Sequence, residues 1–257
     1  MHKSEIYYKW IPFQGKTENP LVLIHGFLET HEIWYKLPLQ QLQRPLLLLD
    51  VPGFGKSQLL DDNEPSIAYF ANEINDLLIA YSIKKFEVVG HSMGGYIGLE
   101  LLQLNPLMER VVLLNSNFWA DHSTKQRDRT RVADLLLKAK NLFINEAIPA
   151  LFIDKKKQAN NIKELVSSAK SGIAEWYAYA SLAMRDRKDF TAYLKENPSK
   201  VEIIHGELDN LISTENIQKL CTGWKDVQII SDSGHMSIFE EPKKVVELLN
   251  QLTAVSR

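Results

Sequence analysis

Short apolar runs recur along the chain and predict the strands of a parallel sheet. They occupy residues 21–26, 45–50, 86–92, 110–116, 201–207 and 227–232. Each run is almost continuously apolar, which is typical of strands that helices cover on both faces. Residues 5–13 instead alternate polar and apolar side chains, so we expect an outer strand there.

Segments with helical spacing separate these runs. Residues 66–83 repeat apolar side chains every three or four positions, and Ser66 can cap the first turn of the helix. The last such segment begins at Pro242, a residue that suits the first helical position. Strands that alternate with helices predict an α/β fold, in which helices flank a mostly parallel central sheet.

The alternation breaks in the segment 118–199. This segment is far longer than a connection inside such a sheet, and its apolar residues recur at helical spacing. It is also too apolar to remain unfolded. We therefore predict an inserted helical cap at 118–199 and a core formed by residues 1–117 and 200–257.

The strongest signal for chemistry is VVGHSMGGYIGLELL at residues 88–102, where a predicted strand runs into a helix. A serine at such a turn has a strained backbone, and small residues two positions before and after it allow the chain to turn tightly. Gly90 and Gly94 meet this condition around Ser92. The turn would present the Ser92 hydroxyl at the carboxyl edge of the sheet, next to the positive end of a helix.

Serine is a weak nucleophile, so Ser92 requires a base, and the base requires an orienting group. We predict His235 as the base, because it lies between the last strand and the last helix. Asp209, which follows the preceding strand, is the predicted orienting acid. Glu207 and Asp232 remain its rivals.

The other histidines suit the role of base less well. His91 adjoins the serine, but neighbouring side chains on such a turn point in different directions, which favours packing or a supporting hydrogen bond. His25 and His205 end predicted strands and are poorly placed in chain order. Three more lack a supporting motif and are expected to be solvated: His2, His31 and His122.

Together these motifs resemble the α/β-hydrolase fold superfamily, in which a triad follows the order serine, acid, histidine. The resemblance covers nearly the whole chain. Besides the serine turn and the acid loop, it rests on an HGF turn at 25–27, a D-x-P-G-x-G-x-S loop at 50–57 and a G-H-x-x-x-x-E-x-P tail at 234–242. It implies an oxyanion hole formed by the backbone N–H groups of Phe27 and Met93.

The 50–57 loop also contains Gly-Lys-Ser, which resembles the end of a phosphate-binding P-loop. Asp50 stands where that motif requires its first glycine, so phosphate binding is disfavoured. The resemblance instead implies a structural loop in which Asp50 and Ser57 bond to nearby backbone, while Lys56 is solvated.

The implied activity is that of a serine hydrolase, which cleaves a carboxylic ester or a related acyl substrate through an acyl-enzyme. Relatives with the same triad hydrolyse C–C bonds, add peroxide or act as lyases, as the menaquinone-pathway synthase does, so these reactions stay open. Many C–C hydrolases of this fold carry Asn before the serine, whereas this chain has His91. A non-catalytic ligand receptor on the same fold is the alternative from another class.

The bulky side chains of the cap favour a small-molecule substrate with an apolar acyl or alcohol part, although helical spacing favours packing between cap helices for most of them. Candidates for contact with it are Phe27, His91, Phe118, Trp119 and Trp176. A basic cluster also occurs in the cap, at Lys125, Arg127, Arg129 and Arg131. Acidic residues interrupt that cluster, so we expect it to form a solvated helix face.

Composition excludes several other functions. The 257 residues have a formal net charge of −2 and a pI near 6.4, which gives no general attraction to nucleic acid or anionic membranes. No apolar run approaches the roughly 18 residues that span a bilayer, and the first residues lack an apolar signal core. The single cysteine, Cys221, forms no internal disulfide and is expected to be inert. We therefore expect a cytoplasmic protein without nucleic-acid or membrane partners, and no motif indicates a metal or cofactor.

Overall fold

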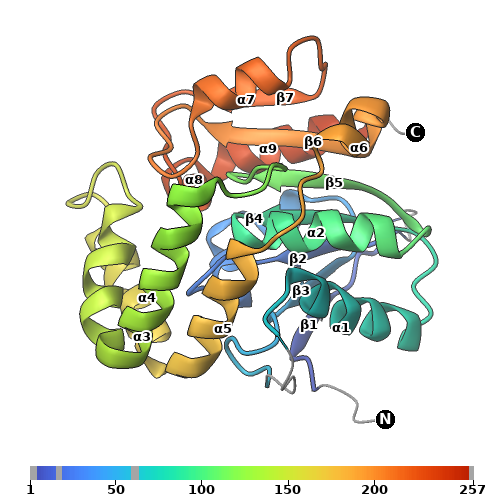
Figure 1. Cartoon of the computed structure of the whole chain (residues 1–257). Helices are drawn as coiled ribbons and strands as arrows, with labels where there is room; N and C mark the ends of the chain where they lie inside the picture. The colour runs from blue at the N-terminus through green and yellow to red at the C-terminus, as the bar shows by residue number, and fades with distance from the viewer. Residues whose placement is uncertain (1–4, 16–18, 59–63, 255–257) are drawn as a thin grey trace.

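The computed structural model describes residues 5–15, 19–58 and 64–254. Within these residues, seven strands form one sheet in the order β1-β3-β2-β4-β5-β6-β7 (Figure 1). The strands are β1 (Tyr8–Ile11), β2 (Leu21–Ile24), β3 (Leu46–Leu49), β4 (Phe86–His91), β5 (Met108–Leu114), β6 (Val201–Gly206) and β7 (Val227–Ile230). β1 runs antiparallel to β3 at the edge, and every other pairing is parallel. The predicted α/β fold with an outer first strand is confirmed.

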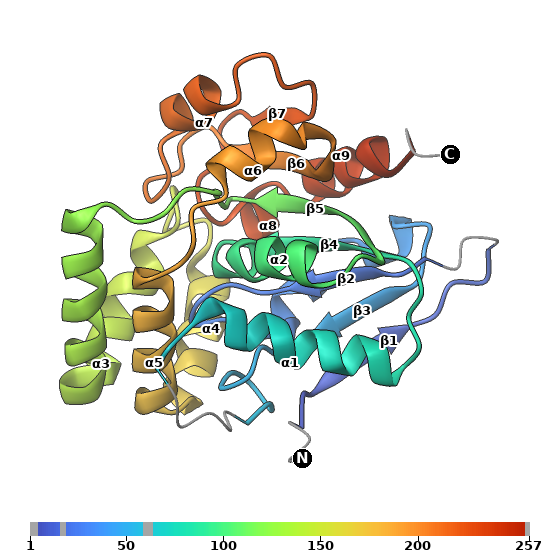
Figure 2. The ribbon, with the colours of Figure 1, turned by 45° about the vertical axis from the view of Figure 1, so that its right-hand side comes forward.

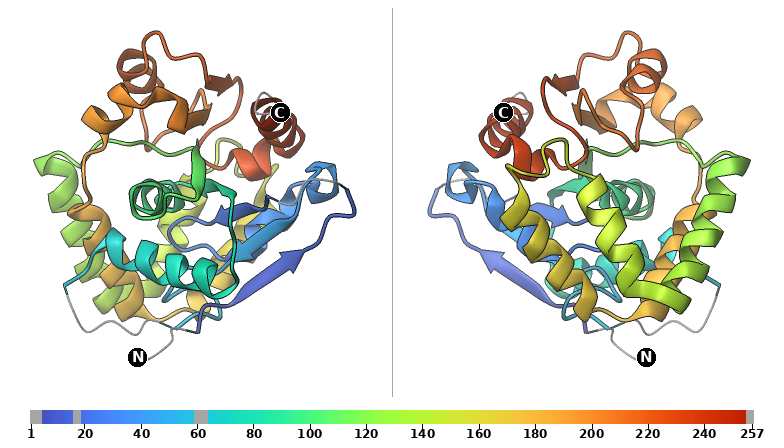
Figure 3. Two further views of the ribbon diagram at one scale, coloured as in Figure 1. Left: turned by 90° about the vertical axis from the view of Figure 1, so that its right-hand side faces the viewer. Right: turned by 90° about the vertical axis from the view of Figure 1, so that its left-hand side faces the viewer.

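Helices cover both faces of this sheet, which explains the continuously apolar strands. Figure 3 shows α1 (Ile67–Ala80) and α2 (Met93–Leu104) on one face and α9 (Pro242–Ala254) on the other. All side chains of β2, β3 and β6 are buried between the two layers. Smaller helical elements complete the core: η1 (His31–Lys36), η2 (Leu39–Gln41), η3 (Pro198–Lys200), α7 (Thr214–Leu220) and α8 (Ser237–Glu240).

Helix α1 begins where the sequence predicts. The Ser66 side chain accepts a hydrogen bond from the Tyr69 backbone N–H at 3.1 Å, which satisfies one of the free donors of the first turn. The buried side chains of the helix recur at three- and four-residue spacing, at Ile67, Phe70, Ala71, Ile74 and Leu78. The predicted amphipathic helix is therefore confirmed.

Three helices stand beyond the carboxyl ends of the strands, on the left in Figures 1 and 2. They are α3 (Ser123–Ala150), α4 (Ala159–Ser171) and α5 (Ala174–Arg185). The backbone of α3 is non-helical at Ala139, so this helix consists of two parts joined at a kink. The fourth helix of the predicted cap segment, α6 (Thr191–Glu196), lies with the core beside β6 instead. None of the described helices is both long enough and apolar enough to cross a bilayer.

Charged side chains join the amino ends of neighbouring strands. Glu87 at the start of β4 pairs with Arg44 and with Arg110, and Arg110 also pairs with Glu202 at the start of β6. Burial raises the pKa of Glu202 to about 7, although the charge of Arg110 opposes that rise. This network lies at the end of the sheet away from the cap, so it serves the core rather than the carboxyl edge.

The 50–57 loop is held by Asp50, as the structural interpretation predicts. One carboxylate oxygen of Asp50 accepts hydrogen bonds from the backbone N–H and the ring Nδ1 of His31, at 2.7 and 2.8 Å. The other accepts the Lys56 N–H at 3.0 Å, and the Ser57 hydroxyl donates to the Asp50 carbonyl at 2.7 Å. His31 is thus buried and bonded, and the prediction that it is solvated is wrong.

Two further expectations concern single residues. Cys221 is buried, and burial raises the pKa of its thiol to about 12, which fits the predicted inert cysteine. His2, which was also expected to be solvated, lies outside the described residues.

Candidate active site

Ser92 occupies a sharp turn between β4 and α2. Its backbone has φ 51° and ψ −115°, a combination that non-glycine residues rarely adopt. A Cβ atom on Gly90 would come within 2.3 Å of the Gly94 carbonyl oxygen, and one on Gly94 within 2.1 Å of the Ile24 carbonyl oxygen. The structure therefore shows why this turn requires glycine on both sides of the serine.

The imidazole of His235 lies between Ser92 and Asp209. Its Nε2 is 3.0 Å from Ser92 Oγ, and its Nδ1 is 2.9 Å from Asp209 Oδ2. Because a carboxylate only accepts hydrogen bonds, Nδ1 carries the proton and the lone pair of Nε2 faces the serine hydroxyl. The rival acids, Glu207 and Asp232, are exposed. The structure thus brings together the three residues that the sequence singles out.

Asp209 is held as a charged group by its surroundings. Its Oδ1 accepts the backbone N–H groups of Leu211 and Ile212 at 2.8 and 3.1 Å. Burial alone would raise the pKa of this carboxyl, but the electrostatic interaction and hydrogen bond with His235 outweigh burial and hold the pKa at about 2. Asp209 is therefore ionised throughout the neutral range.

Asn115, at the end of β5, joins the acid loop to the histidine loop. Its Nδ2 donates to Asp209 Oδ2 at 3.1 Å and to the Gly234 carbonyl at 2.9 Å, while its Oδ1 accepts from the Ser237 hydroxyl. Its φ of 46° lies in the left-handed region, which Asn tolerates better than most residues. Sequence reasoning missed this residue, because its partners lie far along the chain.

A buried ion pair lies behind the serine. His91 Nδ1 is 2.9 Å from Glu29 Oε2, and His91 Nε2 is 3.0 Å from the His235 carbonyl oxygen. Glu29 Oε2 also accepts the Gly26 backbone N–H at 2.6 Å. Two side chains thus connect three loops: the one after β2, the serine turn and the histidine loop.

Each member of this pair favours the charged form of the other. Burial alone would lower the pKa of His91, but the Glu29 carboxylate raises it above its ordinary value. Burial would likewise raise the pKa of Glu29, but the charge of His91 lowers it. A protonated imidazole donates from both ring nitrogens, which suits the two acceptors around His91. The sequence predicts a packing or hydrogen-bonding role for His91 but gives no sign of Glu29 as its partner.

The HGF turn lies against the same site. The Val51 N–H donates to His25 Nε2 at 3.0 Å, and burial lowers the pKa of His25, which keeps it neutral. Leu28 has φ 64°, so the chain reverses sharply after Phe27. Phe27 lines the same cavity as Ser92, and Met93 opens α2 directly after the serine, where a helix has backbone donors without an intrahelical acceptor.

A cavity of about 500 Å³ opens over Ser92 and His235, between the strand ends and helices α3 and α5, and the wall that these helices form is called the cap wall below. Its core wall includes Phe27, Leu28, Glu29, Tyr96 and Asn117. Its cap wall includes an apolar group formed by Val132, Phe143, Ala147, Leu151 and Met184. The volume suits a small organic molecule, and both walls offer it apolar contacts.

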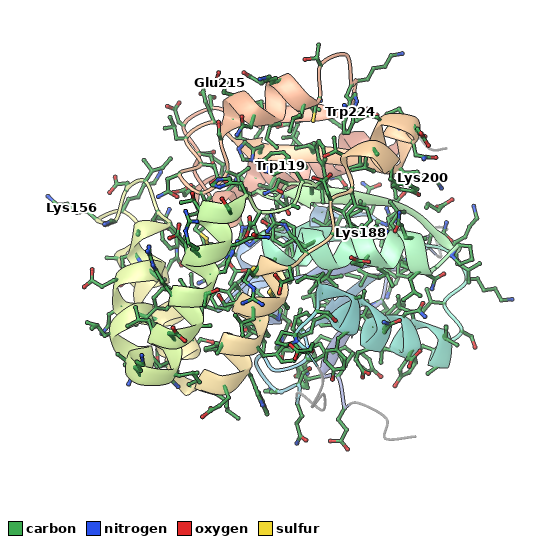
Figure 4. All side chains as sticks on the ribbon, in the orientation of Figure 1. Trp119, Lys156, Lys188, Lys200, Glu215 and Trp224 are labelled. Carbon is green, nitrogen blue, oxygen red and sulfur yellow. The ribbon has the colours of Figure 1, made fainter. Side chains whose placement is uncertain are left out.

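Two of the five predicted substrate contacts line this cavity, namely Phe27 and Trp119. Figure 4 shows Trp119 near the centre of the molecule, where the chain passes from core to cap. His91 is fully buried behind the serine, and Phe118 is buried against the stacked ring of Trp224. Trp176, on α5, is half-buried and is not among the lining residues. These three are therefore not at the cavity wall.

The basic cluster of the cap departs from its expected solvated face. Lys125 and Arg129 line the cavity, together with Asp121 and the helix-capping His122. Arg127 and Arg131 are exposed, as predicted. The cluster therefore divides between cavity and solvent. Among residues 5–15, 19–58 and 64–254, no group of three or more His, Cys, Asp or Glu side chains is arranged to hold a metal ion.

Comparisons with known proteins agree with this architecture. A family model described as alpha/beta hydrolase fold matches residues 19–153, more than half of the chain. A dihydrolipoyllysine-residue acetyltransferase component of the acetoin cleaving system of Pseudomonas putida is 27% identical over 248 residues. That alignment covers 92% of this chain but only 64% of the relative, so the chain spans less than two thirds of that relative's length.

Solved structures show the same fold at lower identity. A thermophilic esterase from Thermogutta terrifontis superposes with a TM-score of 0.86 and 22% identity, over 98% of this chain and 93% of the esterase. An enol-lactonase from Burkholderia xenovorans gives a TM-score of 0.84 and 18% identity, over 98% of this chain and 97% of the lactonase. At such identities the likeness establishes the fold alone.

Proposed function

The chain belongs to the α/β hydrolase fold family, and on that premise we propose that it is a serine hydrolase of carboxylic esters or related acyl substrates. The observation that carries this proposal is the continuous hydrogen-bonded arrangement of Ser92, His235 and Asp209 at the floor of a cavity. The family and its relatives support a hydrolase in general. The ester substrate and the residue roles rest on the geometry of the site.

In the acylation step, Ser92 Oγ attacks the substrate carbonyl carbon while His235 Nε2 takes the hydroxyl proton. Asp209 holds the Nδ1 tautomer and stabilises the imidazolium that forms. The tetrahedral intermediate then expels the alcohol, which receives the proton from Nε2. The acyl group remains on Ser92 as an ester.

Deacylation repeats these steps with water as the nucleophile. His235 Nε2 takes a proton from water, the resulting hydroxide attacks the acyl carbon, and Ser92 Oγ leaves with the proton returned by the imidazolium. The products are a carboxylic acid and the free enzyme. The same histidine thus acts as base and then as acid in each half of the cycle.

The negative charge of each tetrahedral intermediate requires hydrogen-bond donors. We assign this role to the backbone N–H groups of Phe27 and Met93, which flank Ser92 from the loop after β2 and from the first position of α2. Each such donor is worth about 3 kcal/mol of transition-state stabilisation in comparable sites. The Glu29–His91 pair supports this arrangement, because it ties Gly26, next to Phe27, to the histidine loop.

The proposal includes a small-molecule substrate with an apolar part, held against the apolar cap wall of the cavity. It also includes the division into a core of 1–117 and 200–257 and an inserted segment of 118–199, in which α3, α4 and α5 form the cap while α6 lies with the core. We place the protein in the cytoplasm, because its single buried cysteine requires no oxidising compartment.

Turnover of p-nitrophenyl esters of increasing acyl length by wild type and Ser92→Ala tests the proposal. We expect hydrolysis by the wild type and its loss in Ser92→Ala, with the melting temperature of the variant showing a folded protein. Activity that survives the substitution would contradict the mechanism. A vinylogous diketone acid measured beside the esters tests C–C hydrolysis, and tight retention of a ligand without turnover would point to a receptor.

A further inference from the structure

The cap wall of the cavity carries positive charge close to its apolar surface. Lys125 and Arg129 lie four residues apart on α3, so their side chains share one face of that helix. Val132 and Phe143 line the cavity further along the same helix. A substrate that fills the cavity therefore meets both an apolar region and a cationic one.

Arg129 is only partly engaged by the protein. Its Nε donates to Asp121 Oδ2 at 3.1 Å, and its side chain is 19% exposed. The other oxygen of Asp121 pairs with Arg187 Nη1 at 2.8 Å. Two guanidinium groups thus share one carboxylate, and the terminal nitrogens of Arg129 have no hydrogen-bond partner among the described residues.

Arg187 itself is committed to the structure. It donates to the Trp119 and Met184 carbonyl oxygens, and its guanidinium lies 4.2 Å from the centre of the Tyr96 ring. Asp189, a second carboxylate nearby, accepts the backbone N–H groups of Ala120 and Thr191. These contacts commit Asp189 to the backbone, while Arg187 adds positive charge beside the cations of the cavity wall.

Lys125 is the least compensated cation of the site. Its ammonium group has no hydrogen bond or ion pair within the part of the chain that the structure describes. Asp128, the next acid on α3, is within 3.3 Å of Arg131 on the outer surface. Burial lowers the pKa of Lys125, and the neighbouring charge of Arg129 lowers it further. The charges of Asp121 and Asp128 oppose this lowering of the pKa without cancelling it. An anion beside the ammonium group would remove this electrostatic penalty.

We infer that the substrate carries a carboxylate, which binds to the Lys125 ammonium and the terminal guanidinium nitrogens of Arg129. This inference rests on the proposed ester hydrolysis and specifies its substrate class: an ester whose acyl or alcohol part bears a free acid. A guanidinium presents a planar pair of donors that matches a carboxylate, and Lys125 adds a second, movable cation. The apolar cap wall then contacts the carbon chain between the acid and the ester.

Two pairs of esters test the charge requirement. The first pair places the acid on the acyl side: the monomethyl and dimethyl esters of dicarboxylic acids from succinate to suberate. The second places it on the alcohol side: 4-acetoxybenzoate and its methyl ester. We expect kcat/KM to be roughly tenfold higher for the charged member of at least one pair, because one hydrogen bond between charged groups stabilises the bound substrate by about that factor.

Variants of Lys125 identify the group that confers this preference. Lys125→Met keeps the length and apolar stem but removes the charge, and we expect the ratio of kcat/KM for charged over neutral ester to fall roughly tenfold. Lys125→Arg should retain most of the preference. Lys138→Met, at an exposed position on the same helix, is the matched control and should leave the ratio unchanged.

The outcomes separate this inference from the proposed function. Equal efficiency for both members of both pairs in the wild type, or an unchanged ratio in Lys125→Met, would overturn the inference while ester hydrolysis stands. If no ester is hydrolysed, the proposed function fails, and calorimetric titration with 4-acetoxybenzoate decides the anion site by itself. Binding weakened tenfold in Lys125→Met would then support the site, and equal or absent binding would refute it.

Discussion

The two walls of the cavity differ in how their polar groups are satisfied. On the core wall, Glu29 pairs with His91, while His235 lies between Ser92 and Asp209. On the cap wall, Lys125 has no partner among the described residues, and Arg129 is bonded only through its Nε, which donates to Asp121. The catalytic side chains of the core wall are therefore bonded to one another without a ligand, whereas the cations of the cap wall are not.

This difference separates two tasks within one cavity. Catalysis requires groups fixed in advance, and a buried, fully bonded network on strand ends supplies such fixed groups. Selection of a substrate requires groups whose interactions are completed only when the right molecule arrives. Substitutions on the core wall should therefore reduce turnover of every ester, whereas those on the cap wall should change which ester is preferred.

The largest effect is expected at Asp209. Asp209→Asn keeps the shape of the side chain but favours the wrong tautomer of His235, and in comparable triads such a change lowers kcat about 10⁴-fold. Steady-state hydrolysis of p-nitrophenyl acetate measures it. Asp232→Asn is the control, because Asp232 is exposed and its φ of 56° suits Asn. If Asp209→Asn kept a tenth or more of the activity, Asp209 would not be the orienting acid.

A smaller but still general effect is expected at Glu29. Glu29→Gln leaves the charge of His91 buried without its counterion, which should destabilise the fold by about 3 kcal/mol near pH 6. The rates of hydrolysis of charged and neutral esters should both fall roughly tenfold, because the contact that holds His91 against the His235 backbone is weakened. Urea unfolding and kinetics measure the two effects, with the exposed Glu32→Gln as the control.

The pH dependence of that destabilisation has a definite sign. The folded-state pKa of His91 is raised, so its contribution to stability is complete below the unfolded pKa and disappears as pH rises through the folded value. The difference in unfolding free energy between wild type and Glu29→Gln should therefore shrink as pH rises through the folded-state pKa of His91. A difference that grows with pH would show that the pair is not charged.

Phe143 belongs to the apolar part of the cap wall. Phe143→Ala removes apolar surface from the cavity wall, so kcat/KM for octanoyl esters should fall roughly tenfold while that for acetyl esters changes little. Leu142→Ala, one position away on α3, is the control, because Leu142 is 59% exposed. Equal losses for short and long acyl chains would place Phe143 outside the substrate path.

The smallest effect is expected far from both walls, at Ser66. Ser66→Ala removes the N-cap of α1 and should lower the free energy of unfolding by about 1 kcal/mol. Neither the turnover of an ester nor the preference for charged substrates should change. A change in either of them, measured on the folded variant, would mean that stability and function are not separable as the two walls suggest.

The sequence predicts the core wall well, because the motif around Ser92 requires one particular backbone turn there. A strained serine between two glycines permits few structures, and the continuous apolar runs define the sheet that carries it. Boundaries were less accurate, since β5 begins at Met108, two residues before the predicted run. Burial of His31 escaped prediction, because it depends on Asp50, nineteen residues away in the chain.

The cap wall is harder to predict for a physical reason. Helical spacing reports which residues are apolar, but it does not say whether a face meets the core, a neighbouring helix or a cavity. Trp176 and Phe118 thus resemble Trp119 in sequence, but only Trp119 lines the cavity. Lys125 and Arg129 resemble their solvated neighbours Arg127 and Arg131. Their position in the cavity emerges only when α3 is placed over the strand ends.

The most direct test of the account is labelling with a fluorophosphonate probe, followed by mass spectrometry of the modified peptide. Such a probe reacts covalently with a serine only where a base activates it. We predict stoichiometric labelling of the wild type at Ser92, lost in His235→Ala. Absence of labelling in the folded wild type, labelling at another residue, or undiminished labelling in His235→Ala would contradict the proposed serine mechanism.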